Sequence, residues 1–347
     1  MKAHHRLTGL DGLRAIAALG VLLHHFSEHA SRLVPELFFA HPVKGVTGVL
    51  WPFQVGAQGV TLFFIISGFV ILNSLMRCKR GVDFAFGRFS RLYPLFWFAV
   101  CVTTAVRLGL SQDDVSLRNF LANLTMVPTL WSESIIDGVY WTLIVELKFY
   151  LLAYLVWRFK GLERIETVCA AWLSLTVVNQ LLLQRGLVPE LTHWATDWLI
   201  LKHAPLFTCG IMLFSLHQRG SAPARWALLL TALALATGGG GLIKGGVALV
   251  SCLAVWAVCQ DISLPAITSR LMVYLGGASY ALYLMHSTIG WHIGSALFKH
   301  GWPVAGAVVT SAALCVSTAL LAHHFIEKPS QAWLRQWWAA RSHPSKG

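Results

Sequence analysis

Long apolar segments alternate with short polar connections along almost the whole chain. A helix that crosses a bilayer takes about 17–25 residues, and ten of these segments are long enough. We expect transmembrane helices roughly at residues 9–27, 55–76, 91–110, 138–157, 166–184, 198–216, 226–241, 242–260, 272–294 and 303–326. The pattern predicts an all-α, polytopic membrane helix bundle. We expect a single domain over residues 1–347, with its core at about 8–330 and a basic cytoplasmic tail at 331–347.

Composition agrees with a membrane protein. Hydrophobic residues make up 56% of the chain and charged residues 12%, whereas soluble domains average about 25% charged residues. The 15 tryptophans suit the aromatic belts at membrane interfaces. None of the seven cysteines forms a CxxC pair, so we predict neither a disulfide framework nor a metal site.

The basic residues predict an orientation in the bilayer. With the amino terminus inside, 17 Lys and Arg residues fall in cytoplasmic segments and 8 on the opposite side, while Arg14 and Lys148 lie within spans. This asymmetry places both termini in the cytoplasm. The net charge of +12 is therefore explained by cytoplasmic loops next to the bilayer, and we expect no nucleic-acid partner.

The first apolar segment carries charge that a bilayer disfavours. It reads GLDGLRAIAALGVLLHHF from Gly9 to Phe26, and an ionisable group inside a membrane suggests a functional site. On a helix, Arg14 and His25 differ by about 20° in azimuth and about 16 Å in height, whereas His24 is turned about 80° from Arg14. His25 is thus expected to share a face with Arg14. Placement of the charges at the two membrane interfaces is the alternative.

Two other spans contain ionisable residues. VYWTLIVELKFYLL places Glu146 about two turns into the fourth span, and GGASYALYLMH places Tyr280, Tyr283 and His286 three residues apart. A lone buried histidine is more often structural. A carboxylate at the depth of Glu146 needs a partner or a water-filled cavity, and the combination with His25 favours a site.

A pair of arginines lies on the cytoplasmic side. FGRFSRLYPLFW sets Arg88 and Arg91 three residues apart just before the third span, with Pro94 in the first turn of that span. Guanidinium groups offer a planar fork of donors that suits phosphate. Ordinary positive-inside topology explains the pair equally well, so the residues alone leave both interpretations open.

Six motifs together resemble one family, the acyltransferase 3 family of integral membrane, acyl-CoA-dependent acyltransferases. They are LDGLRAIAALGVLLHH, GVTLFFIISGFVI, RFSRLYP, WTLIVELKFY, SYALYLMH and HHFIEKP. Each motif is weak alone, but they occur in the family's order from about residue 8 to residue 330. The chain departs from the family by its His24–His25 doublet. It also has no periplasmic SGNH-type domain, so the resemblance implies either a separate periplasmic acyltransferase partner or the absence of that step.

The resemblance assigns roles to the residues singled out above. It implies that His25 is the catalytic histidine and that Arg14, Arg88 and Arg91 bind the acyl-CoA. Glu146 is expected to act in catalysis, by orienting or charge-balancing His25 or by positioning the acceptor. Substrate contacts are expected from Tyr280, Tyr283 and His286. Acyl-CoA is expected as a donor substrate, with no permanently bound cofactor.

The resemblance implies an O-acyltransferase in the bacterial inner membrane. It would move an acyl group, expected to be acetyl, from cytoplasmic acyl-CoA to a hydroxyl of an envelope or exported glycan or of a lipid-linked saccharide. One alternative is a transporter with a His/Glu proton relay, although the inverted repeats and broken helices typical of transporters are not detected. A haem or metal protein is a further alternative, suggested by the doublets His4–His5, His24–His25 and His323–His324.

Overall fold

The computed structural model of the chain describes residues 8–34, 55–110, 114–184, 186, 190–238 and 241–342. Across these ranges the regular elements are all helical and no strand occurs, which confirms the all-α prediction. Among the described residues, six stretches are long and apolar enough to cross a membrane: Gly59–Met76, Gly81–Leu110, Gly138–Arg158, Gly161–Gln184, Gly241–Cys259 and Val304–Ser342. The chain is therefore a multi-pass membrane protein. The ten-span count and the cytoplasmic termini stay predictions, and His4–His5 and the last five residues of the predicted tail lie outside the described ranges.

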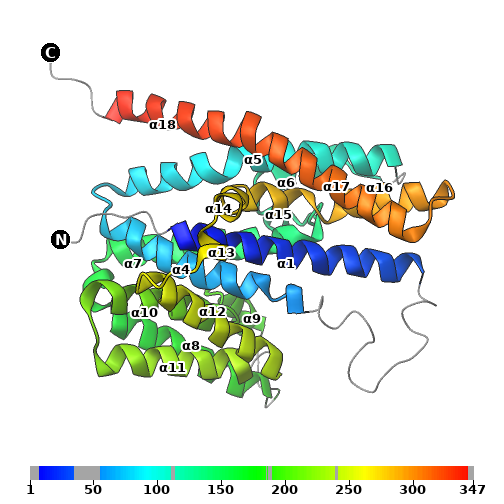
Figure 1. Cartoon of the computed structure of the whole chain (residues 1–347). Coiled ribbons are helices and arrows are strands. Elements are labelled where there is room, and N and C mark those ends of the chain that lie inside the picture. Colours follow the sequence, from blue (N-terminus) through cyan, green and yellow to red (C-terminus); the bar gives the residue numbers. More distant parts are fainter. Residues whose placement is uncertain are drawn as a thin grey trace. The chain divides into compact units, whose positions relative to one another are not determined.

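The chain forms two compact units, and helix α1 (Thr8–Leu33) contributes residues to both. The first unit combines residues 1–17, 58–81 and 143–277. In this unit α8, α10, α11 and α12 lie side by side (Figure 1). Besides the start of α1, its elements are α4 (Gly59–Met76), most of α7 (Trp141–Arg158), η4 (Gly161–Arg164), α8 (Ile165–Gln184), α9 (Glu190–Trp198), α10 (Ala204–Arg219), α11 (Pro223–Gly238), α12 (Gly241–Cys259), α13 (Pro265–Thr268) and α14 (Arg270–Gly277).

Helices α4 and α10 pack closely because each presents a glycine to the other's backbone. A Cβ added at Gly210 would lie 1.9 Å from the carbonyl oxygen of Ile65, and one added at Gly68 would lie 2.3 Å from that of Phe207. Small residues permit this approach between membrane helices, whose association depends on packing rather than on exclusion of water. The glycines of α4 and α10 thus position the centre of the first unit.

The second unit combines residues 18–57, 82–142 and 278–347. Its elements are the rest of α1, most of α5 (Gly81–Leu110), α6 (Leu117–Leu124), the 3-10 turns η2 (Pro128–Trp131) and η3 (Gly138–Tyr140), α15 (Ser279–Met285), α16 (Thr288–Lys299), α17 (Val304–Ala322), the π-helical turn η5 (His323–Glu327) and α18 (Lys328–Ser342). Helix α17 packs on α15 and α16. It runs without a break through η5 into α18.

The prediction of one continuous span at 272–294 is wrong. The segment is divided into α14, α15 and α16, with breaks at Ala278 and at residues 286–287. Apolar composition is continuous across the segment, so hydropathy cannot locate the breaks. At the second break, the carboxylate of Asp137 accepts a hydrogen bond of 3.1 Å from the backbone N–H of Thr288. This distant residue satisfies one of the N–H groups that a helix start leaves without a partner.

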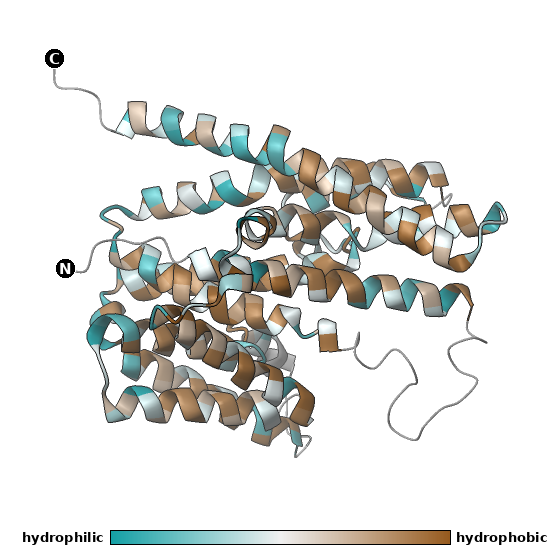
Figure 2. Ribbon diagram, in the orientation of Figure 1, coloured by the Kyte–Doolittle hydropathy of each residue, from teal (hydrophilic) through white to brown (hydrophobic). Residues whose placement is uncertain are grey.

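The third span also differs from its prediction. Helix α5 begins ten residues earlier than expected, so Pro94 lies in its interior rather than in its first turn. The early part of α5 is supported by α18, because the Phe86 and Trp338 rings stack with centroids 4.3 Å apart and the Trp338 indole N–H donates to Asp83 at 2.8 Å. Hydrophilic residues gather on these two helical stretches (Figure 2). Membrane helices tolerate an interior proline where neighbouring groups satisfy the freed backbone.

Candidate functional site

His25 and His286 meet in the second unit. Nδ1 of His25, on α1, lies 3.3 Å from Nε2 of His286, and the two ring centroids are 4.9 Å apart. The same Nδ1 of His25 lies 3.0 Å from the carbonyl oxygen of Val21, one turn earlier on α1. The sequence separates the two histidines by 261 residues, and the structure places them in contact.

The partners of the two rings assign their tautomers. Nδ1 of His286 faces two carbonyl oxygens, those of Leu282 at 3.1 Å and Tyr283 at 2.8 Å, so in the neutral ring this nitrogen carries the proton. Nε2 of His286 is then an acceptor, and Nδ1 of His25 must donate to it and to Val21. Nδ1 of His25 therefore carries the proton, and its Nε2 keeps the lone pair. This is the form that a general base needs.

His24 differs from its neighbour. Its ring lies edge-on to that of His25, with centroids 5.1 Å apart. Its Nδ1 is buried and makes no hydrogen bond to any described residue. The two adjacent histidines thus have different surroundings, as the helical positions of His24 and His25 predict.

Asp137 holds the segment that follows His286. Its side chain is fully buried, and its two carboxylate oxygens accept backbone hydrogen bonds of 3.1 Å each, from Val139 and from Thr288. Asp137 thus joins the start of η3 to the start of α16. Nothing in the sequence pattern singled out Asp137 for this role. Its position as a capping residue before a helical turn was the available signal.

The two tyrosines of the SYALYLMH motif bond to the protein backbone. The Tyr280 hydroxyl donates to the carbonyl oxygen of Leu92 at 3.0 Å. The Tyr283 hydroxyl donates to the carbonyl oxygen of Val139 at 3.1 Å and accepts from the Thr142 hydroxyl at 2.8 Å. These bonds fix α15 within the second unit. Substrate contact by Tyr280 and Tyr283 stays a prediction.

Glu146 belongs to the first unit, on α7. Its Oε1 accepts hydrogen bonds from the Tyr150 hydroxyl and, at 3.3 Å, from the Ser67 hydroxyl of α4. Lys148, two residues further along, pairs with Asp197 at 2.5 Å. The carboxylate predicted from the WTLIVELKFY motif is therefore embedded among hydroxyl donors. Ser67 carries no signal in the sequence that would single it out.

Arg14 also belongs to the first unit. Its guanidinium lies 3.3 Å from the carboxylate of Asp11, and both side chains are largely enclosed. The backbone here is tightly packed, since a Cβ at Gly276 would lie 1.8 Å from the Asp11 carbonyl oxygen. Arg14 and Asp11 form a pair within the protein, and α1 carries both Arg14 and His25 on one continuous helix.

Arg88 and Arg91 lie in the second unit, on the part of α5 beside α18. The Arg88 guanidinium lies 5.7 Å from the centroid of the Phe84 ring. The carbonyl oxygen of Arg91 faces the amide of Gln331 at 3.5 Å. Both arginines are half-buried. Helical spacing places them one turn apart, where two guanidinium groups can reach one phosphorylated ligand.

Known proteins are similar to the chain along most of its length. A family model described as an acyltransferase domain matches residues 7–322. The exopolysaccharide production protein ExoZ of Rhizobium meliloti is 28% identical over 307 residues, which cover 80% of this chain and 90% of the relative. The acyltransferase MdmB of Streptomyces mycarofaciens is 25% identical over 367 residues, covering 93% and 91%.

A third relative matches over a shorter stretch. The O-acetyltransferase OatA of Staphylococcus aureus is 27% identical over 186 residues, which cover 47% of this chain and 27% of OatA. About a quarter of OatA is therefore represented in this match. No solved structure matches the chain.

Proposed function

Because the chain belongs to the acyltransferase family whose model spans nearly its whole length, we propose that it O-acylates a glycan at the bacterial inner membrane. The chain is an enzyme that transfers acyl groups. In the proposal the donor is cytoplasmic acyl-CoA, the transferred group is acetyl, and the acceptor is a hydroxyl of an envelope or exported saccharide. A separate periplasmic acyltransferase is proposed as a partner where a later transfer step is needed.

The tautomer of His25 carries the proposal. With the proton held on Nδ1, the Nε2 lone pair is available to remove the proton of an acceptor hydroxyl. The hydroxyl oxygen attacks the thioester carbonyl, the carbon–sulfur bond breaks, and the coenzyme A thiolate takes the proton back from the imidazolium. The products are an ester and free coenzyme A. An alternative route passes through a transient acyl-histidine and has the same reactants and products.

The remaining residues have supporting roles in this proposal. Arg88 and Arg91 bind the phosphates of acyl-CoA. Donor binding by Arg14 stays a prediction. The role expected for Glu146, charge balance or positioning of the acceptor, stays a prediction. His286 holds His25 in the reactive tautomer and, with α15, borders the acceptor.

The relatives support the choice of acceptor and acyl group. One is named for exopolysaccharide production and one is named an O-acetyltransferase. All three relatives come from bacteria. A saccharide acceptor and an acetyl group are consistent with these names.

Mass spectrometry of cell-envelope glycans tests the function directly. Glycans are compared from cells with the chain, cells without it, and cells that carry His25→Ala. We expect acetyl esters in the first sample that are missing from the other two. Identical acylation in all three samples would contradict the proposal.

Topology tests the cytoplasmic donor side. Reporter fusions after Gly161 and after Gly220 are expected to report from the cytoplasm, and a fusion after Asp114 from outside. An external report at Gly161 would place the α7–α8 connection on the wrong side and overturn the assigned orientation.

A further inference from the structure

Helix α6 exposes leucines and buries asparagines. Leu117 and Leu121, one turn apart, are 72% and 52% exposed, whereas Asn119 and Asn123 are buried. A helix at a protein–water boundary has the opposite arrangement, with apolar residues inside and amides outside. The medium on the exposed face of α6 is therefore expected to be apolar.

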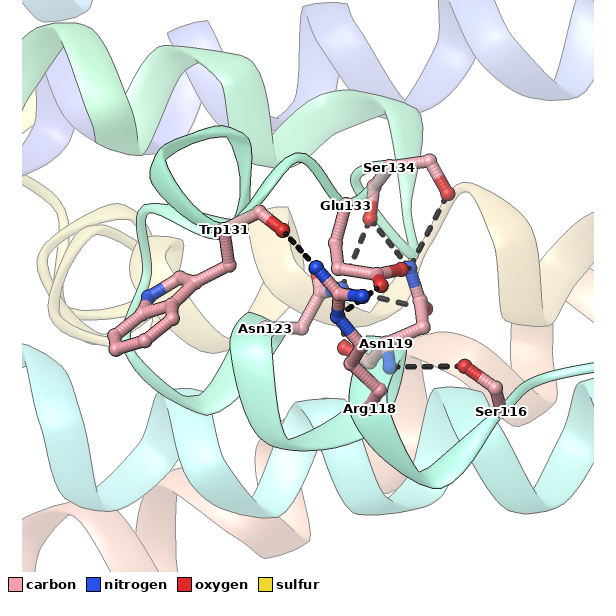
Figure 3. A network of polar contacts seen from close by, with 7 residues as sticks. All are labelled: Ser116, Arg118, Asn119, Asn123, Trp131, Glu133 and Ser134. Carbon is pink, nitrogen blue, oxygen red and sulfur yellow. Dashed lines mark hydrogen bonds and ion pairs between the residues drawn. The ribbon is translucent and has the colours of Figure 1, made fainter.

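The buried amides of α6 bind the backbone of the returning chain (Figure 3). Asn119 and Asn123 both donate to the carbonyl oxygen of Ser134, at 2.9 and 3.0 Å, and the Asn123 side-chain oxygen accepts from the N–H of Ile136 at 3.0 Å. The segment thus satisfies irregular backbone with its own side chains. Irregular backbone needs such partners wherever water is scarce.

The carboxyl end of α6 lies deep along α5. The Trp97 indole N–H donates to the carbonyl oxygen of Leu124 at 2.9 Å, and the Tyr93 hydroxyl donates to that of Thr125 at 3.1 Å. Trp97 lies 13 residues before Leu110, the last residue of α5, which is about 20 Å of helix rise. Even with the reach of an indole side chain, the end of α6 lies well inside the end of this membrane-spanning helix.

The residues around the amino end of α6 and the end of η2 are of the types found at a membrane interface. The Arg118 guanidinium pairs with Glu133 at 3.0 Å and donates to the carbonyl oxygen of Trp131 at 3.0 Å. The Trp131 indole points away from this network (Figure 3) and is 57% exposed. Tryptophan and arginine at one level suit the headgroup region of a bilayer.

We propose that residues 116–131 re-enter the membrane from the side on which α5 ends, with Leu117 near the headgroup level and Leu121 against lipid acyl chains. The helix descends into the hydrocarbon region, turns after Thr125, and returns through η2 to the interface. The partner of this surface is the bilayer itself. The proposal does not depend on the proposed enzymatic function.

Spin labels at positions 117 and 121 test the re-entry. Each site is replaced by cysteine after Cys78 and Cys101 are changed to Ser, since the other five cysteines are buried. The full-length protein is reconstituted in phosphatidylcholine vesicles with a chelated nickel complex on both sides. Collision rates with oxygen and with the nickel complex then report lipid or water around each label.

Two references calibrate the labels. Leu253, 58% exposed on the membrane-spanning helix α12, serves as the lipid-facing site, and Lys79, exposed between α4 and α5, serves as the aqueous site. We expect Leu121→Cys to match Leu253→Cys, with high oxygen and low nickel collision rates.

Depth distinguishes re-entry from a helix that lies flat on the surface. The label at 121 is expected about 6 Å deeper than the label at 117, from four residues of helix rise. Equal depths would overturn the re-entry. Nickel access at 121 equal to that at Lys79 would show that the leucine face is in water and would overturn the lipid contact.

Discussion

Replacing His25 by Ala removes Nε2, the nitrogen whose lone pair serves as the base in the proposed reaction. His24→Ala is the matched control, because it deletes an adjacent ring of the same type on another face of α1. We expect His25→Ala to abolish acyl transfer while the protein still inserts into the membrane and still binds coenzyme A. His24→Ala is expected to keep most of its activity.

The size of the effect follows from the role of each ring. Loss of a general base costs a factor of about 10² to 10⁴ in rate, or about 2.7–5.4 kcal/mol of transition-state stabilisation at about 1.36 kcal/mol per factor of ten. His286→Ala removes one neutral hydrogen bond to His25, which contributes about 0.5–1.5 kcal/mol. That is a rate loss of about two- to thirteenfold. His286→Gln keeps an acceptor oxygen within reach of His25 and is expected to recover part of the rate that His286→Ala loses.

The assay measures initial rates of transfer of labelled acetyl groups from acetyl-CoA to isolated envelope glycan, with coenzyme A binding as the test of a folded donor site. Equal losses in the His24 and His25 variants would refute the helical-face argument. Retained transfer in His25→Ala would show that His25 is not the base. A larger loss in His286→Ala than in His25→Ala would make His286 the reacting group.

Three further outcomes are expected. Arg88→Ala or Arg91→Ala is expected to raise the KM for acyl-CoA. Lysine at either position restores only part of the affinity, because the bidentate fork of the guanidinium is lost. Unchanged acyl-CoA binding would show that these arginines only set the topology. Gly210→Ala lowers stability in detergent by about 1–3 kcal/mol through overpacking, whereas Gly246→Ala, with open space around it, changes thermal unfolding little; equal shifts would contradict the packing argument. Asp137→Ala destabilises the protein by about 1–3 kcal/mol, since buried N–H groups lose their acceptor; an unchanged unfolding temperature would argue against the capping role.

Hydropathy predicted the helical class because apolar length is a property of each segment alone. It failed where a distant residue decides local structure. The segment 272–294 is apolar throughout, yet α15 ends and α16 begins beside the buried carboxylate of Asp137. Pro94 was expected in a first turn, but α5 begins at Gly81, and its early part contacts α18 through Asp83 and Trp338. Neither contact leaves a periodic signal in the sequence.

For the candidate site too, positions within one helix were predictable from the sequence, whereas contacts between helices were not. Helical spacing separated His25 from His24, and the motifs singled out His286 without indicating that the two histidines touch. The hydroxyl of Ser67 beside Glu146 was not predicted. Such contacts depend on the packing of separate helices, which spacing within one helix does not encode.

A histidine on a helix often bonds through Nδ1 to the carbonyl oxygen four residues earlier, and this alone does not mark a site. His25, His286 and His300 all have this geometry, at 3.0, 3.1 and 2.7 Å, and His300 is exposed at the end of α16. His25 differs because its Nδ1 also faces an acceptor nitrogen from another helix. Two acceptors at one nitrogen keep the proton there even when either hydrogen bond lengthens, so the lone pair stays on Nε2. The histidine opposite His25 therefore supports the proposed role of His25 as the base, and relatives with the same chemistry are expected to place an acceptor at the position of His286.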